Sequence, residues 1–295
     1  MSQVKLFWDP QGFALDALGD HQFLGATDGD TPAISVAIRM LSIDTPEVHY
    51  PGNQKPSKQD ANLKQLAEWI QQGKAPISAG LAAHLHPKLA TGTAGSLQET
   101  QGNRATEHFK NLLDEKLKRP DGSKRKLFVW TGDEKFDQYG RLLAYIAPNY
   151  SDAERARLSR KERATFNLLM IEAGWAASLI IYPSIPGYPD LVLFQETGQA
   201  AFDAPRGAWA NPLALAGYEF RMCVKLFDVT DKLVKGQTVS RAEREGWIER
   251  YCADMTTREI FFPQDYFRVK PYNRLFIWSK DVTDAVSKLN LVPAE

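Results

Sequence analysis

Three charged side chains stand in one nine-residue string, Arg39-Met40-Leu41-Ser42-Ile43-Asp44-Thr45-Pro46-Glu47. An arginine keeps its positive charge and donates two parallel hydrogen bonds to the oxygens of a phosphate or a carboxylate. A carboxylate can hold a hard cation or take a proton from water. Because Pro46 turns the chain sharply, the string brings together a fixed cation, a metal-type carboxylate and a second carboxylate.

A second string, Asp137-Gln138-Tyr139-Gly140-Arg141-Leu142-Leu143-Ala144-Tyr145, ends a charged loop and begins a predicted strand. Arg141 lies directly before the predicted strand over 142–146, and Arg39 lies in the predicted strand over 33–41. A phosphodiester resists attack because its oxygens are negative and its leaving group is poor. Catalysis on it therefore depends on positioning and on stabilising negative charge. Arg39 and Arg141 are a candidate pair of phosphate clamps.

Short strands and a few helices are expected to position these groups. Alternation of apolar and polar residues predicts a strand over 33–41, and another is expected over 21–27. Asp28-Gly29-Asp30 between them has the composition of a hairpin turn. Further along, the sequence predicts a helix over 104–117, strands over 127–130 and 142–146, and helices over 167–173 and 191–203.

Residues 48–103 read as an insertion between the first string and the helix that follows. Helices are expected over 57–72 and 77–85, and a loop rich in Gly, Thr and Ser over 90–102. Because the insertion begins directly after Glu47, its first residues must lie beside the charged string. Its composition suits a mobile cover better than a core element.

Both strings resemble signatures of the staphylococcal nuclease (thermonuclease) family. The matching patterns are a strand arginine followed by Ile-Asp-Thr-Pro-Glu, and Asp-x-Tyr-Gly-Arg-x-Leu-Ala-Tyr. Asp28-Gly29-Asp30-Thr31 is similar to a third motif of that family, and residues 167–174 and 200–209 are similar to parts of its later helices. The likeness covers residues 20–210, with the insertion as an interruption. It implies an α+β fold with a mainly β core, a five-stranded OB-fold barrel with flanking helices.

The resemblance also implies calcium-dependent hydrolysis of DNA or RNA. Asp44 and the carbonyl of Thr45 would bind Ca²⁺, and Glu47 would orient or deprotonate the attacking water. Arg39 and Arg141 would hold the phosphate and stabilise the charge that develops on it.

Two tyrosines are candidate substrate-binding residues by the same resemblance. Tyr139 matches a tyrosine that donates a hydrogen bond to the substrate phosphate. Tyr182 lies near the place of a base-stacking tyrosine, where this chain has Ile180. A lysine that often precedes the first tyrosine is Gln138 here. Both departures weaken the expected contacts with a nucleotide.

The second metal carboxylate is left open between Asp30 and Asp20. Neither stands at the family's usual spacing from Asp44. Asp30 keeps the whole Asp-Gly-Asp-Thr string but shortens the hairpin, whereas Asp20 would leave Asp28-Gly29 as the hairpin turn. Asp30 is favoured because the whole string matches.

The overall composition fits a globular enzyme with local rather than global charge. The chain has 295 residues and a formal net charge of zero, whereas a tight nucleic-acid-binding protein usually carries a basic surplus. No stretch approaches the roughly 20 apolar residues of a membrane span, and the start lacks a secretory pattern. We expect a cytoplasmic protein without membrane contact, with secretion of a trimmed form as the alternative. Cys223 and Cys252 are expected to be buried thiols rather than a disulfide.

The residue pattern changes near position 217. We predict an OB-fold domain over 1–217 and a separate α+β module over 218–295. In the module, strands are expected over 220–229 and 259–269, and helices over 240–253 and 280–289. Since it carries none of the motifs, the module is not expected to perform chemistry.

The first functional hypothesis is a nuclease that cuts nucleic acid by metal-assisted, in-line attack of water. The alternative is an OB-type module that has lost cleavage and binds nucleic acid or protein. Retention of Arg39, Asp44, Glu47 and Arg141 together favours the enzyme, because a binding module need not keep a general base.

Overall fold

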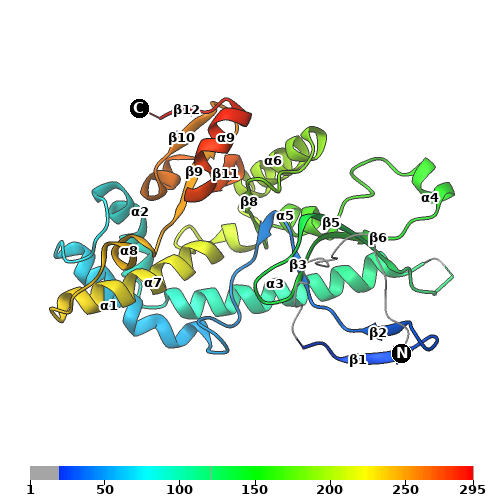
Figure 1. Ribbon diagram of the computed structural model, residues 1–295, viewed down its shortest axis with the longest axis horizontal. Coiled ribbons are helices and arrows are strands. Elements are labelled where there is room, and N and C mark those ends of the chain that lie inside the picture. Colours follow the sequence, from blue (N-terminus) through cyan, green and yellow to red (C-terminus); the bar gives the residue numbers. More distant parts are fainter. Residues whose placement is uncertain (1–19, 120, 295) are drawn as a thin grey trace, which may run out of the picture.

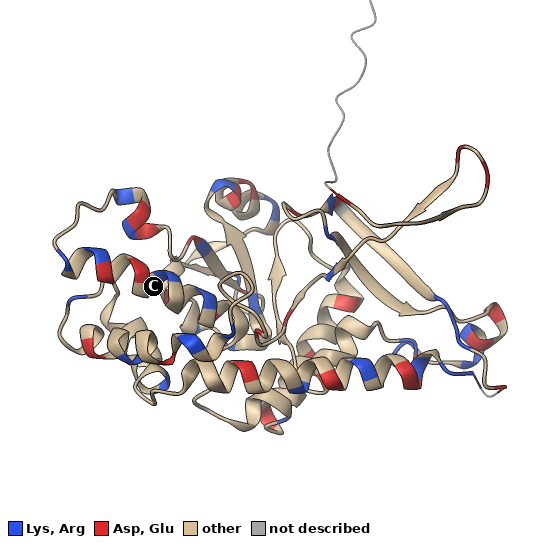
Figure 2. Cartoon of the chain, turned by 90° about the horizontal axis from the view of Figure 1, so that it is seen from below, with Lys and Arg blue, Asp and Glu red and all other residues tan. Residues whose placement is uncertain are grey.

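The computed structural model describes residues 20–119 and 121–294. Helices and several small sheets alternate along the chain, so the predicted α+β class is confirmed. Figure 1 shows the long helix α3 (Ala94–Leu117) running beneath the sheets and toward α7 (Gly217–Val234). Acidic and basic residues alternate along α3 (Figure 2), as the net charge of zero leads one to expect.

The strands nearest the two charged strings form a three-stranded sheet of β3 (Ile38–Met40), β6 (Leu142–Pro148) and β5 (Leu127–Phe136), in that order. β3 and β6 are parallel, and β6 and β5 are antiparallel. Separate two-stranded sheets pair β1 (Phe23–Ala26) with β2 (Pro32–Ile34), and β4 (Ile43–Asp44) with β7 (Ala177–Ser178).

In the described part of the chain these strands do not close into a five-stranded barrel. The β1–β2 hairpin projects from the body in Figures 1 and 2 and leaves Phe23 and Leu24 each 63% exposed. The hairpin therefore buries no continuous apolar face, and burial of that kind is what holds a strand in a barrel wall.

A hydrophobic core lies between the three-stranded sheet and the helices that follow it. α4 (Asp152–Arg157) begins with a capping box of Ser151 and Glu154, and Thr165 caps α5 (Phe166–Glu172). α6 (Tyr188–Asp203) packs on α5. The fully or nearly buried members of this core are Ile43, Ala105, Leu112, Ala144, Ile146, Ala164, Phe166, Leu168, Met170, Ile171, Ala176 and Phe194.

The insertion is a core element, and the expectation of a mobile cover is wrong. Its helices α1 (Asp60–Gln71) and α2 (Ala79–Leu89) match the predicted ones. The predicted loop over 90–102 is instead mostly the first two turns of α3. Gly95 lies so close to other backbone that a Cβ there would stand 2.1 Å from the Pro56 carbonyl oxygen. The small residues serve close packing here, not loop flexibility.

The C-terminal part adds α8 (Arg241–Glu245), α9 (Val282–Leu289) and a five-stranded sheet. The sheet order is β12 (Val292–Pro293), β10 (Glu259–Phe261), β9 (Arg250–Asp254), β11 (Arg274–Trp278) and β8 (Ile180–Ile181). The strand predicted over 220–229 is wrong, because this segment lies in α7. The helix predicted over 240–253 is α8 followed by β9, and only the start of 259–269 is a strand. The helix predicted over 280–289 is confirmed as α9.

The division at residue 217 stays a prediction, but extensive packing crosses it. β8 pairs in parallel with β11, and the largest core joins the insertion to the C-terminal part. Members of that core include Leu63, Leu66, Leu81, Leu85, Leu89, Phe220, Val224, Leu226, Tyr266 and Phe276. Cys223 and Cys252 are free and buried, as expected. Within the described ranges, none of the helices is both long and apolar enough to cross a membrane.

Candidate active site

Strands β3 and β6 bring Arg39 and Arg141 to one edge of the sheet. In the parallel register Arg39 lies opposite Leu143, so Arg141 stands two positions earlier on the neighbouring strand. Arg141 directly precedes β6, so the register brings it close to Arg39 along the chain direction of the two strands.

The loop before β6 holds Arg141 through a single carboxylate. Asp137 Oδ2 accepts hydrogen bonds from Arg141 Nε at 2.7 Å and Nη2 at 2.6 Å, and Oδ1 accepts from the backbone N–H groups of Tyr139 and Arg141. Burial raises the pKa of Asp137, but these hydrogen bonds outweigh it and leave the pKa below its ordinary value. Tyr139 is 73% exposed, and the Arg141 guanidinium lies 5.4 Å from its ring centroid. This end of the site is open to solvent.

Asp44, at the end of β4, forms the buried end of the site. Its side chain is 1% exposed, and Oδ1 accepts hydrogen bonds from Arg39 Nη2 and Arg221 Nη2, both at 3.0 Å. Burial alone would raise the pKa of Asp44, but the charges of Arg221 and Arg39 outweigh it and lower the pKa. The carboxylate is therefore ionised and paired with two guanidinium groups.

Glu47 shares the second arginine. Its Oε1 accepts a hydrogen bond from Arg221 Nη1, and its side chain is 23% exposed. Burial raises the pKa of Glu47, the nearby charge of Asp44 adds to this, and Arg221 opposes it; the pKa ends above its ordinary value. Glu47 is thus a partly accessible carboxylate with a proton affinity higher than usual.

The insertion fixes the backbone at Glu47. With the amide of Gln98 oriented to satisfy both neighbours, its oxygen accepts from Glu47 N at 2.8 Å and its nitrogen donates to the Leu215 carbonyl at 3.0 Å. Gly102 of α3 packs so tightly there that a Cβ would lie 2.6 Å from the Glu47 carbonyl oxygen. α3 therefore supports the turn that carries Glu47.

The family model described as "Staphylococcal nuclease homologue" matches residues 37–211. The chain belongs to this family. The matched stretch is more than half of the chain and contains both charged strings, so the resemblance drawn from them is confirmed. No curated protein matches the chain.

Nucleases of this family are generally dependent on Ca²⁺, but the described arrangement does not fit that ion. Asp44 Oδ2 is buried without a hydrogen-bond partner, as a metal ligand can be. The backbone of Gly217 covers it, however. A Cβ on Gly217 would lie 2.6 Å from this oxygen and 2.4 Å from the Thr45 carbonyl oxygen. Both predicted ligand oxygens thus face the first residue of α7, and the described residues include no group of three or more His, Cys, Asp or Glu able to hold a metal.

Neither candidate for the second metal carboxylate joins this cluster. Asp30 lies in the exposed β1–β2 turn and accepts a hydrogen bond from Thr31 Oγ1 at 3.1 Å. Asp20 is exposed at the first described residue of the chain. Asp30 and Asp20 remain open alternatives without support from the described positions.

Tyr182 is also placed apart. It is 5% exposed, belongs to the core formed by β8, β9, β11 and α9, and donates a hydrogen bond through its hydroxyl to Asp284. Its environment indicates a packing role and does not support the predicted contact with substrate.

Arg221 is the residue of the cluster that sequence reasoning missed. It lies beyond the matched family region, in a segment predicted to be a strand. One signal was available. Glu219 is the third residue of α7, and an acidic residue at this position is typical of a helix start. In the structure it accepts a hydrogen bond from Ala216 N at 3.1 Å. A helix that begins at Gly217 places Arg221 one turn after its start, where it contacts Asp44 and Glu47.

Proposed function

We propose that this family member is a phosphodiesterase that hydrolyses DNA or RNA at the Arg39–Arg141 edge. The observation that carries the proposal is the parallel pairing of β3 with β6, which supports Arg39 and Arg141 on neighbouring strands, together with the Asp44 carboxylate that Arg39 contacts. Two planar guanidinium groups can bind the non-bridging oxygens of one phosphate and stabilise its developing charge.

The reaction can be written with the chain's own residues. Glu47 accepts a proton from a water molecule as the water oxygen forms a bond to phosphorus. The bond from phosphorus to the 5′-oxygen breaks, and that oxygen takes a proton from solvent water as it leaves, so a 3′-phosphate remains. Arg39 and Arg141 hold the five-coordinate transition state in line. The pKa of Glu47 is raised, chiefly by burial, and a raised pKa makes the carboxylate a stronger base.

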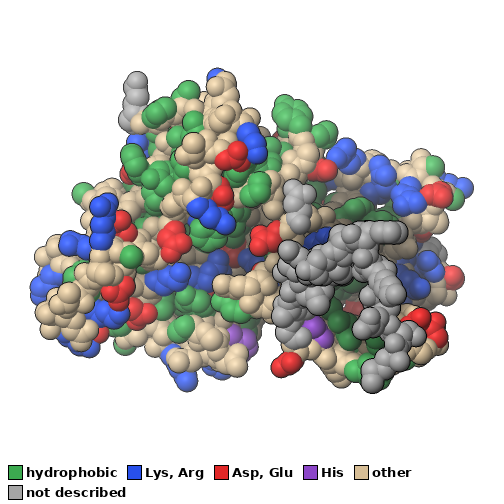
Figure 3. Space-filling model, viewed as in Figure 1, with side chains coloured by type: hydrophobic (Ala, Val, Ile, Leu, Met, Phe, Trp, Pro, Cys, Tyr) green, Lys and Arg blue, Asp and Glu red, His purple; other side chains and the backbone are tan. Residues whose placement is uncertain are grey.

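A hollow beside β5 and β6 supports nucleic acid as the substrate. Its volume is about 600 Å³, and it is lined by aromatic rings and guanidinium groups, among them Phe128, Trp130, Tyr150, Arg155, Arg160 and Arg163. Aromatic rings stack on bases, and arginines neutralise phosphates. Basic side chains gather over α4 in Figure 3. Tyr145 also lines the hollow and hydrogen-bonds Ser42 at 2.5 Å, two residues before Asp44.

A second candidate function has one specific observation behind it. Arg221 occupies Oε1 of the carboxylate that would act as the base, so this oxygen is already engaged in a hydrogen bond. The chain would then bind nucleic acid at the arginine edge without cutting it.

Cleavage assays with binding assays separate these functions. The purified chain is incubated with labelled single-stranded DNA, duplex DNA and RNA, each with Ca²⁺ or with EDTA. We expect cleavage of at least one substrate, reduced about 100-fold or more in Glu47→Gln and in Arg141→Ala. Lys225→Gln, an exposed cation of α7, is the matched control and should leave cleavage unchanged. Binding without cleavage by the unmodified chain would overturn the enzyme in favour of the binding module.

A further inference from the structure

A single guanidinium group bridges the two carboxylates of the candidate site. Arg221 donates from Nη2 to Asp44 Oδ1 at 3.0 Å and from Nη1 to Glu47 Oε1. It is 24% exposed. Burial would lower its pKa, but the charges of Asp44 and Glu47 outweigh this and raise it. Arginine is well suited to such a bridge, because its fork offers several donors in one plane.

We propose that Arg221 is the resident cation of this site and holds Asp44 and Glu47 in place of a divalent metal ion. Arg221 acts as a positioning residue, because it acts on substrate through Glu47. The inference rests on the proposed function only for the location of the site.

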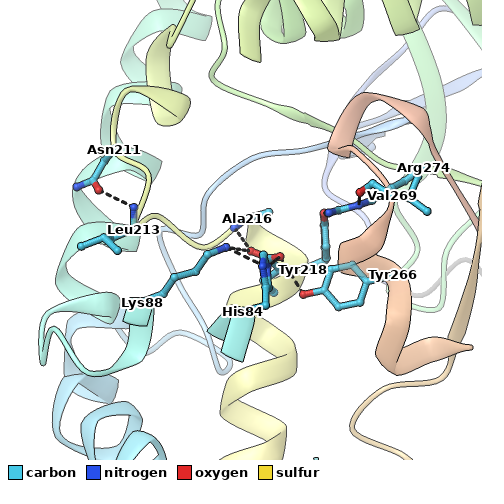
Figure 4. Close-up of polar contacts among 10 residues, drawn as sticks. His84, Lys88, Asn211, Leu213, Ala216, Tyr218, Tyr266, Val269 and Arg274 are labelled. Atoms are coloured by element: carbon cyan, nitrogen blue, oxygen red, sulfur yellow. Dashed lines mark hydrogen bonds and ion pairs between the residues drawn. The ribbon is translucent and has the colours of Figure 1, made fainter. Parts of the chain in front are cut away.

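The start of α7 is held by several buried contacts, so Arg221 cannot leave the Asp44 and Glu47 carboxylates to admit a metal ion. Glu219 is 4% exposed and accepts hydrogen bonds from His84 Nε2 at 3.0 Å, Lys88 Nζ at 3.0 Å and the Tyr266 hydroxyl at 2.8 Å. Figure 4 shows these side chains converging on the first turn of the helix, with Tyr218 and Arg274 beside them.

Packing along the rest of α7 adds to this anchor. The residues of α7 that are fully or almost fully buried in the largest core are Tyr218, Phe220, Met222, Cys223, Val224 and Leu226. Withdrawing the helix would expose these side chains and leave Glu219 without its partners, both of which are costly. Arg221 is therefore a permanent component of the site.

The charges around Arg221 also argue against an additional cation. Asp44 and Glu47 supply two negative charges, and Arg39 and Arg221 supply two positive ones. The charge of Arg221 further lowers the pKa of Arg250, after burial as the larger cause, which shows that a third guanidinium lies within electrostatic reach. A divalent ion would have to enter an already neutralised cluster, whereas an anionic phosphate would be attracted.

The first test measures metal binding without nucleic acid. The full chain, freed of metal with EDTA, is titrated with Ca²⁺ by calorimetry, and its melting temperature is recorded with Ca²⁺ and with EDTA. We expect no binding heat at millimolar Ca²⁺ and the same melting temperature in both buffers. Binding of Ca²⁺ that disappears in Asp44→Asn would overturn the proposal. Because no substrate is present, this result is independent of whether the chain cuts nucleic acid.

The second test asks whether the charge of Arg221 is what matters. Arg221→Ala should melt lower than the control Lys225→Ala at pH 7. The difference should shrink as the pH falls, first where Glu47, whose pKa is raised above its ordinary 4.5, becomes protonated, and further below pH 3.8, where Asp44, whose pKa is lowered, becomes protonated. Millimolar methylguanidinium should restore part of the loss, and Ca²⁺ should not.

A loss that is the same at both pH values, or one that Ca²⁺ restores, would overturn the proposal. If Arg221→Ala does not fold, Arg221→Lys keeps the charge with a different geometry. It should fold and remain unresponsive to Ca²⁺, and a calcium-dependent rise in its melting temperature would count against the inference.

Discussion

The β1–β2 hairpin and the first turn of α7 are opposite in their relation to the candidate site. The hairpin carries Asp30, the favoured second metal ligand, yet its turn is exposed and projects from the body. The first turn of α7 carried no expected role, yet Gly217 and Arg221 contact the Asp44 carboxylate directly. The difference teaches that burial and available partners, more than motif likeness, decide which charged residues enter a site.

The strongest test of this comparison is removal of the buried anchor of α7. Glu219→Ala leaves Lys88 and His84 without the carboxylate that pairs with them, and uncouples the start of the helix from Tyr266. Breaking a buried pair of this kind costs about 3–5 kcal/mol. We expect that loss in urea unfolding. A variant as stable as the unmodified chain would mean that the turn is not held as described.

Close packing at Gly217 gives the next largest effect. A methyl group there would lie 2.4 Å from the Thr45 carbonyl oxygen and 2.6 Å from Asp44 Oδ2. We expect Gly217→Ala to lose about 1–3 kcal/mol of stability through overpacking. Gly29, which has no left-handed φ and no neighbour near its Cβ position, is the matched control, and Gly29→Ala should be nearly neutral. If Gly217→Ala is neutral, α7 does not sit against the carboxylate.

Acid pH should lower the stability that the contacts of Glu219 give to α7, and it should not change the stability of the β1–β2 hairpin. Burial raises the pKa of Glu219, but Lys88 and His84 outweigh it and hold the pKa well below the ordinary value of 4.5. A lowered folded-state pKa gives stability that is present above pH 4.5 and is lost as the pH falls below it. Glu219→Gln should therefore flatten the pH dependence of unfolding in this range. An unchanged slope would contradict the assignment.

The hairpin should show the smallest effects. Asp30→Ala and Asp20→Ala remove exposed carboxylates, so neither should change the melting temperature appreciably. Activity, with or without Ca²⁺, should stay within about twofold. A sharply increased Ca²⁺ requirement in Asp30→Ala alone would place the hairpin in the site and reverse the comparison.

Local patterns predicted the parts of the fold that local physics determines. The helices of the insertion follow from periodicity over a few residues. The single strand predicted over 33–41 is only partly right, because the chain forms β2 and β3 in two different sheets. The two signature strings, with Asp44 and Glu47 in the first, lie within the matched family region.

The errors arose where distant partners decide the structure. The start of α3 has the composition of a loop. Gly95 and Gly102 are needed in this helix because the backbone of Pro56 and of Glu47 packs where a Cβ atom would lie. Residues 220–229 are rich in apolar side chains that suit strand or helix. The helix wins because Phe220 and Val224, four residues apart, share one buried face. Arg221 was missed because its partners lie 174 and 177 residues earlier in the chain.

That sequence separation has a consequence for how the molecule is made. Synthesis delivers Asp44 and Glu47 long before Arg221 leaves the ribosome, and α3 and α1 also await α7 to complete their shared core. Contacts this far apart in the chain form late and slowly, because a long loop must close first. The nascent protein therefore carries an unfinished site until α7 has been translated, and a chain terminated before α7 cannot assemble it.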